Sequence, residues 1–516
     1  MKKFTLFMVL VTSLAACKKQ DLSQLTEKDK ELAASLARGA DPHERATFSL
    51  LSTIALAGGA GAAEISAFDA QTKKLFVVNN SSGVNQIDIY DLSDPANPTL
   101  SGNINTAQFG GFVNSVSVHG GKLAAAIEAV DKVSAGRILV FATGTYEVIA
   151  NVVVGSLPDM VTFSPDGQYI LSANEGEPND AYTIDPVGSV SIINVAANYA
   201  VSTLDFSGFE NRSTELKSKG FRIFGLNASF AQDIEPEYIA VAENSKKAWV
   251  TLQENNGIAL IDLDAKKIVD VFPLGFKDYA NPQNSIDPSD QDGGIFFNPW
   301  KVKGIYMPDG ISVLANNNVP FVFTANEGDS REYSGFSEIK RISSNSVVLD
   351  PTAFPTAGQL KTPGMLGRLN ITTTLGDSDQ DGDLDELYSY GARSFSIWHG
   401  LTGELLYDSQ DFIDKKAAEL NIYPDGRSDD KGCEPEAITT GRVGNKNILF
   451  VGLERANAVM VFEMSNPMKP QFLQVLKTGT APEGVLFVPA AESPNAKSTL
   501  IVSNETSGTV SIFTTN

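Results

Sequence analysis

The chain has 516 residues, of which 42% are apolar and 20% are charged, so it can bury a core and is not a disordered polymer. Its 62 acidic and 40 basic residues give a formal net charge of −22, which argues against nucleic acid as a partner, because phosphate binding needs a basic face. The same charge suits divalent cations, or simply solubility in salty surroundings.

The first twenty residues have the pattern of a bacterial lipoprotein signal. Two lysines precede a short apolar stretch, and the segment "LAAC", which ends at Cys17, resembles a lipobox. We therefore expect a signal peptide over residues 1–16 and lipid on Cys17, which would anchor the protein to the membrane of a bacterial cell envelope, on the periplasmic or the surface face of the outer membrane. A plain signal peptide that contains a cysteine is the alternative. Residues 17–47, which are polar and helix-prone, are predicted to form a tether.

Residues 48–516 are predicted to be all-β, because short runs of Val, Ile and Phe alternate with turns of Gly, Asn, Asp and Pro. Seven segments share one pattern: an acid, a strand, a turn, a second strand ending near a glutamate, a loop, and a strand resembling GxVxIF. These segments begin at Glu64, Asn114, Pro158, Pro236, Pro308, Pro435 and Pro482. Seven such units predict a seven-bladed β-propeller with insertions at about 270–307 and 334–390.

The first strand of this body is predicted to close the ring. The run "FSLLSTIAL", from Phe48 to Leu56, would supply the outer strand that the last unit lacks, so that the N- and C-terminal strands pair. A pair of β-sandwiches is the competing architecture, but neither the repeat period nor the overlap of the two ends has a role there.

Acidic or amide residues recur at two places in the repeat. At or before the first strand they are Glu64, Asp159, Glu237, Asp309, Glu436 and Glu483. Where the second strand ends they are Asn79, Glu128, Glu175, Glu254, Glu327, Glu454 and Glu505. Equivalent positions in a propeller lie on a circle, so we expect a ring of carboxylates at one mouth of the channel, neutralised by cations or by Arg331, Arg393, Arg442 and Arg455. Such a ring is either a cation site or a set of acceptors for backbone N–H groups of the next blade.

The segment "GDSDQDGDLDE" predicts a Ca²⁺ site. Three aspartates alternate before Gly382, as in the D-x-D-x-D-G part of an EF-hand loop, whose oxygens suit a hard cation. The twelfth position holds Tyr388 instead of a bidentate glutamate, and Glu386 is expected to substitute for it. The predicted ligands are Asp377, Asp379, Asp381, Asp383, Asp385 and Glu386, and a shorter cluster of Asp287, Asp290 and Asp292 is a second candidate.

Motifs of several enzyme classes are missing. Three histidines and two cysteines form no HExxH motif and no closely spaced pair, which argues against a conventional zinc site. Neither a G-x-S-x-G elbow nor a Walker-type loop occurs. Acid-rich sites can hydrolyse phosphoesters through two bound metals, so the scarcity of histidine does not exclude an enzyme.

Four motifs carry a family resemblance: "LPDMVTFSPDGQYILSANEGEPND", "MPDGISVL…TANEGDSREY", "YGARSFSIW" and "GRSDDKGCEPEAI". They resemble the choice-of-anchor I family, which includes bacterial surface proteins and is similar to animal mesenchyme-specific cell-surface glycoproteins linked to biomineralisation. The resemblance implies a propeller-like, secreted or surface-anchored protein associated with calcium. Some relatives carry an alkaline phosphatase label, but the resemblance supplies no catalytic residues. Cys433 stands where the family pattern leads us to expect proline.

The leading hypothesis is an envelope-anchored lipoprotein that binds Ca²⁺ and acts as a surface binding module, with an extracellular polymer or protein as a candidate ligand. The alternative is a metal-dependent phosphoesterase, and a purely structural scaffold is a third hypothesis. The candidate central site comprises Glu175, Glu177, Asp180, Glu237, Glu254, Asp309, Glu327, Asp329, Arg331, Arg393, Glu434, Glu436, Glu454 and Glu483.

Overall fold

A computed structural model of the chain describes residues 44–81, 83–316 and 319–516. The predicted signal peptide, the lipidated Cys17 and most of the predicted tether lie outside these residues. Among the residues that the structure describes, no helix is both long enough and apolar enough to cross a membrane.

Seven four-stranded antiparallel sheets make up the body of the described chain. The first three sheets comprise β2 (Ser66–Asp69), β3 (Lys74–Asn79), β4 (Gln86–Asp91) and β5 (Thr99–Asn105); β6 (Val113–His119), β7 (Lys122–Ile127), β8 (Ala135–Ala142) and β9 (Val148–Ser156); β10 (Pro158–Phe163), β11 (Tyr169–Asn174), β12 (Ser189–Asn194) and β13 (Ala200–Asp205). The fourth and fifth comprise β14 (Pro236–Val241), β15 (Lys247–Leu252), β16 (Gly257–Asp262) and β17 (Lys267–Pro273); β20 (Ile311–Asn316), β21 (Val319–Asn326), β25 (Ser394–His399) and β26 (Leu405–Asp408). The last two comprise β27 (Pro435–Val443), β28 (Lys446–Leu453), β29 (Ala458–Glu463) and β30 (Gln471–Lys477); β31 (Pro482–Val488), β32 (Thr499–Asn504), β33 (Thr509–Thr515) and β1 (Phe48–Ala55).

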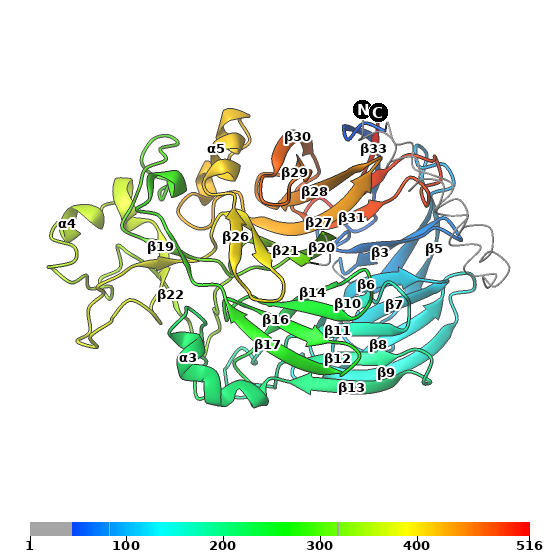
Figure 1. Cartoon of the computed structure of the whole chain (residues 1–516), viewed down its shortest axis with the longest axis horizontal. Helices are drawn as coiled ribbons and strands as arrows, with labels where there is room; N and C mark the ends of the chain where they lie inside the picture. Colours follow the sequence, from blue (N-terminus) through cyan, green and yellow to red (C-terminus); the bar gives the residue numbers. More distant parts are fainter. Residues whose placement is uncertain (1–43, 82, 317–318) are drawn as a thin grey trace, which may run out of the picture.

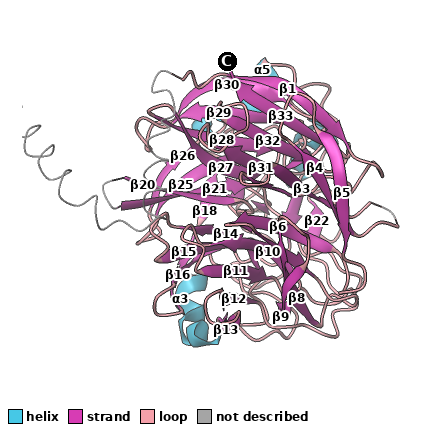
Figure 2. Cartoon of the chain, turned by 90° about the vertical axis from the view of Figure 1, so that its right-hand side faces the viewer, coloured by secondary structure: helices cyan, strands magenta, loops and turns pink. Residues whose placement is uncertain are grey.

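The sheets form a closed ring. The first strand of each sheet contacts the first strand of the next, and β31 contacts β2. Each of the seven junctions between neighbouring sheets has its own apolar cluster, including one between the last sheet and the first. Figure 2 shows β6, β10, β14, β27 and β31 near the centre, and β5, β9, β13 and β30 at the periphery. This arrangement confirms the predicted all-β propeller.

The position of each strand in its blade determines how many of its residues are buried. The second and third strands of each blade pack on both faces, so β11 and β28 are almost continuously buried. The outermost strands β5 and β13 leave most residues exposed or half-exposed. The ring closes where β1 pairs antiparallel with β33, from Phe48 opposite Thr515 to Ala55 opposite Thr509.

One long segment joins the fourth blade to the fifth, before β20, and a second interrupts the fifth blade between β21 and β25. Residues 274–310 and 327–393 form a lobe on the side of the molecule opposite β5 (Figure 1). The lobe holds the sheet of β18 (Phe276–Asp278), β19 (Lys303–Ile305) and β24 (Tyr388–Ser389), the pair β22 (Ile339–Arg341) and β23 (Asn370–Thr372), and the helices η2 (Pro282–Asn284), α4 (Ala357–Leu360) and η3 (Pro363–Gly367). It has an apolar cluster of its own around Tyr279, Phe354 and Ile371.

The remaining helices lie in the connections between blades. They are η1 (Ser207–Arg212), α3 (Ser213–Lys217), α5 (Phe412–Glu419) and η4 (Asp425–Arg427). Helix α5 buries Ile413 and Ala417 in the apolar cluster between the fifth and sixth blades.

Candidate functional site

Irregular pairing at the start of the first strand leaves an acidic or amide residue out of the ladder in five of the seven blades. The register of β6 with β7 skips Asn114, that of β10 with β11 skips Asp159, and that of β31 with β32 skips Glu483. Wider irregularities in β14 and β27 leave out Glu237 and Glu436. A residue that the ladder does not hold can turn towards the axis, which is the known effect of a β-bulge on a side chain.

These side chains, together with Glu64 and Asp309 from the other two blades, line one cavity of about 270 Å³ at the mouth of the channel. We call them the first ring; each blade supplies one member. The first ring is Glu64, Asn114, Asp159, Glu237, Asp309, Glu436 and Glu483. Further along the axis lies a second cavity of about 340 Å³, which residues of the same first strands line. The acidic ring therefore sits at one end of the channel, as the sequence predicts.

A second ring follows the second strand of each blade. Its members are the residues directly after β3, β7, β11, β15, β21, β28 and β32: Asn80, Glu128, Glu175, Gln253, Glu327, Glu454 and Glu505. The sequence analysis named Asn79 and Glu254 here, one residue away from the equivalent positions. Asn79 is still inside β3, where its amide donates to Asp88, and Glu254 is buried one residue beyond the ring.

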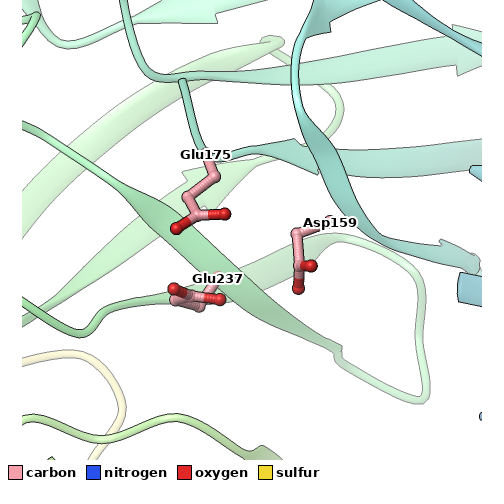
Figure 3. A group of neighbouring side chains, drawn as sticks. All are labelled: Asp159, Glu175 and Glu237. Carbon is pink, nitrogen blue, oxygen red and sulfur yellow. The ribbon is translucent and has the colours of Figure 1, made fainter. Parts of the chain in front are cut away.

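Several groups of three carboxylates converge in the described part of the chain, and two of them occupy equivalent ring positions at blade junctions. Asp159, Glu175 and Glu237 each offer one oxygen, and these oxygens lie within 4.8 Å of one another; we call this group triad A. Figure 3 shows its three carboxylates facing a common space. Each triad takes both ring positions of one blade and the first-ring position of the next. The equivalent group two blades further on is triad B, which comprises Asp309, Glu327 and Glu436.

Desolvation inside the mouth raises the pKa of these carboxyls, and neighbouring carboxylates raise it further. The pKa of Glu64 rises to about 8 and that of Glu483 to about 9. The pKa of Asp159 rises to about 6, and those of Glu175 and Glu237 lie well above their usual range. Like charges this close oppose one another's ionisation unless positive charge lies between them.

Basic side chains reach only part of the two rings. The Lys431 Nζ atom lies 2.6 Å from Glu327 Oε1, and the Arg455 Nη1 atom lies 2.8 Å from Glu454 Oε1. Glu434 is buried beside both of these bases and Arg427, so its charge is already matched. Lys431 could not be predicted from the sequence, because only the folded chain brings it to Glu327, 104 residues away.

The other predicted neutralising arginines lie elsewhere. Arg331 pairs with the buried Asp233 and Glu235 at 2.5 and 2.9 Å. Arg393 donates to backbone carbonyls in the lobe and in the loop before β27, and lies 3.7 Å from Asp414. Arg442 is exposed near the far end of β27. These arginines fasten loops, whereas Arg455 alone among the four forms an ion pair with a ring carboxylate in the described part of the chain.

The loops after β11 and β21 are joined beside the mouth. The Tyr333 hydroxyl donates to Glu177 Oε1 at 3.0 Å, and the Ser334 hydroxyl donates to Asp180 Oδ2 at 2.6 Å. Asp329 lies in the same loop, where desolvation raises its pKa. Glu177 and Asp180, which the sequence analysis placed in the central site, therefore hold this loop junction.

The aspartate loop of the lobe forms a separate acidic group. Oxygens of Asp377, Asp379 and Asp385 lie within 4.8 Å of one another, and Asp385 also belongs to a group with Asp383 and Asp350. Sequence spacing could not reveal Asp350, because the bridge between Leu349 and Leu384 brings it to the loop. In contrast to triad A, this loop binds its own carboxylates: the backbone N–H groups of Asp381 and Gly382 donate to Asp377.

Other predicted ligands in the lobe have protein partners. Glu386 accepts hydrogen bonds from Lys303, at 2.7 Å, and from the Tyr388 hydroxyl. Arg368 forms a bidentate pair with Asp290, at 2.7 and 3.1 Å. In the same cluster, Asp287 accepts from the backbone N–H groups of Ser289 and Phe296, and Asp292 from that of Gly294. Asp381 accepts from the N–H of Asp383.

Fold and site together define a β-propeller with carboxylates concentrated at one end of its channel. The chain belongs to the choice-of-anchor I domain family, whose model matches residues 64–467. Domains of this family are typically associated with cell surfaces.

The chain is similar in sequence to two curated proteins, and its fold can be superposed on a solved structure. The chain is 27% identical over 183 residues to Gigasin-3a of Magallana gigas, covering 29% of this chain and 64% of that protein. It is 25% identical over 280 residues to the mesenchyme-specific cell surface glycoprotein of Strongylocentrotus purpuratus, covering 46% of this chain and 36% of that protein. The chain thus spans less than two thirds of either relative. A chain of Kuenenia stuttgartiensis hydrazine synthase superposes with a TM-score of 0.46 at 11% identity, covering 89% of this chain and 96% of that one.

Proposed function

We propose that this protein is a calcium-binding β-propeller, anchored by lipid at the bacterial envelope, that serves as a surface binding module. The carrying observation is the convergence of Asp377, Asp379 and Asp385, joined by Asp350 from a distant part of the lobe. Two oxygens that both lie about 2.4 Å from one Ca²⁺ are at most about 4.8 Å apart, so this group fits the ion. The D-x-D-x-D-G spacing and the surface association of the family support the same function.

Calcium titration of the full chain in detergent tests this proposal. Ca²⁺ should raise the melting temperature, since a ligand present at about 100 times its Kd stabilises the folded state by about 2.7 kcal/mol. The double variant Asp379→Asn/Asp381→Asn should lose most of this rise. The matched control is Asp94→Asn, which changes an exposed aspartate in a blade turn. An equal rise in all three proteins would refute calcium binding by the loop.

Membrane attachment is tested separately. Cys17→Ser should abolish metabolic labelling with palmitate and release the protein from the membrane fraction, because the thiol would be the acceptor of lipid. Attachment that persists without Cys17 would contradict the lipid anchor and leave the calcium result untouched.

A metal-dependent phosphoesterase is a second candidate, because two carboxylate triads border a single cavity and paired metals can hydrolyse phosphoesters. Turnover of a generic phosphomonoester or phosphodiester that a chelator abolishes and added metal restores would favour the enzyme. No turnover with any divalent metal would exclude these substrates and favour the binding module.

A further inference from the structure

We propose that triad A, formed by Asp159, Glu175 and Glu237, is a divalent-cation site at the propeller axis, separate from the calcium loop. The site would take a hard ion such as Ca²⁺ or Mn²⁺. Its three carboxylate oxygens lie within 4.8 Å of one another, which allows all three to reach one such ion. Water in the cavity of about 270 Å³ would complete the coordination.

Glu175 supplies an observation that is independent of the crowding of acids. Glu175 directly follows β11, only 9% of the residue is exposed, and its side chain points towards Asp159 and Glu237 (Figure 3). Within residues 44–81, 83–316 and 319–516, the Glu175 carboxylate forms no hydrogen bond and no ion pair, whereas Asp159 and Glu237 are hydrogen-bonded to each other. A buried carboxylate is ordinarily paired or bound to a metal, and that of Glu175 has no protein partner among these residues.

Equivalent positions in other blades show what a protein partner looks like here. In the first blade the second-ring residue is Asn80, and its amide donates to Glu64 Oε2 at 2.8 Å. In the fourth blade it is Gln253, which donates to Glu327 Oε2 at 3.1 Å. In the fifth blade it is Glu327 itself, and Lys431, in the connection to the sixth blade, places an ammonium group 2.6 Å from Glu327 Oε1. A donor therefore reaches a ring carboxylate at each of these three places, and none reaches Glu175 within the described residues.

The chemistry of the donors identifies the class of ligand. Three carboxylates without histidine or cysteine favour a hard cation over zinc or copper. The triad lies on strand ends of two adjacent blades, so its spacing is fixed by the packing of the propeller. An organic ammonium ligand would satisfy the charge as well, and competition between it and the metal distinguishes the two.

The test counts cations bound by the full chain in the Asp379→Asn/Asp381→Asn background, so that the calcium loop does not contribute. Mn²⁺ and Ca²⁺ are titrated by calorimetry, and Tb³⁺ luminescence is excited through tyrosine, because Tyr238 lines the same cavity. We expect one remaining cation per chain. Glu175→Gln should weaken its binding by about tenfold or more. This substitution reproduces the glutamine found naturally at residue 253, so folding should be preserved.

Two further variants keep the test decisive. Glu505→Gln changes the same ring position in a blade outside triads A and B, and should leave the affinity almost unchanged. Glu237→Gln removes a second ligand of triad A and should act like Glu175→Gln. Equal affinities in all these proteins, binding that vanishes at high salt, or displacement by methylammonium but not by Ca²⁺ would each overturn the proposal. Loss of binding at the calcium loop alone would leave it standing.

Discussion

Triads A and B occupy equivalent junctions of the propeller but differ in the source of their positive charge. In triad B, Glu327 has both oxygens engaged, one by the Lys431 ammonium and one by the Gln253 amide. In triad A, Glu175 has neither kind of partner, although its backbone position is the same. The difference shows that one scaffold can place carboxylates identically and leave their neutralisation to a lysine at one junction and to a free cation at another.

Replacing Lys431 should cause the largest loss of stability and tests whether this lysine neutralises triad B. Lys431→Met leaves Glu327 without its ammonium partner in a buried setting, and removing one member of a buried ion pair costs about 3 kcal/mol or more. Urea unfolding without divalent metal should show this loss of stability. Added Ca²⁺ should recover part of it by occupying triad B, so the variant should bind one cation more than the parent chain. A variant that is as stable as the parent would show that Lys431 does not neutralise triad B.

The pH dependence of stability should reveal the crowding of the mouth. Glu64 and Glu483 have folded pKa values of about 8 and 9 against an ordinary 4.5, because desolvation and neighbouring carboxylates oppose their ionisation. A raised folded pKa stabilises the folded protein at low pH, and this contribution is lost as pH rises from about 4.5 through 9. In chelator, the free energy of unfolding should therefore fall over that range.

Glu483→Gln is the matched variant for this pH profile. It removes one of the two titrating groups and one neighbour of the other, so the profile should flatten. A parent protein whose stability rises between pH 5 and pH 9 would contradict the electrostatic description of the mouth.

Gln253→Glu should have the smallest effect on stability. It tests most directly whether ring position alone determines metal binding. It places a carboxylate between Glu237 and Asp309, which completes a triad at the fourth blade. Without metal the added like charge should cost about 1 kcal/mol. With Mn²⁺ the variant should gain affinity or one bound ion, measured by calorimetry. A loss of metal affinity would show that ring position alone does not determine binding.

The repeated part of the fold could be predicted from the sequence because the evidence is local. An acid, two strands and a GxVxIF strand recur within each unit, and the overlap of "FSLLSTIAL" with the last blade predicts the pairing of β1 with β33. The all-β propeller follows from these patterns. The ring members at Asn80 and Gln253 were misplaced by one residue, because the end of a strand is set by hydrogen bonds that a single sequence does not show.

The chemistry of the site was harder to predict than its location. Lys431 reaches Glu327, and Asp350 reaches the aspartate loop, only through tertiary packing. Arg331 and Arg393 were expected near the ring carboxylates, yet they hold loops in place. Arg331 neutralises the buried Asp233 and Glu235, and Arg393 lies beside the buried Asp414. Residue type predicts where charge accumulates, but long-range pairing decides which charges remain without a partner.

The most direct test of the central claim is anomalous X-ray diffraction from crystals of the full chain containing Mn²⁺. We expect an anomalous peak bound by Asp159, Glu175 and Glu237, and none among Asp309, Glu327 and Glu436, where Lys431 supplies the charge. An empty first site, or peaks of equal height at both, would contradict the claim.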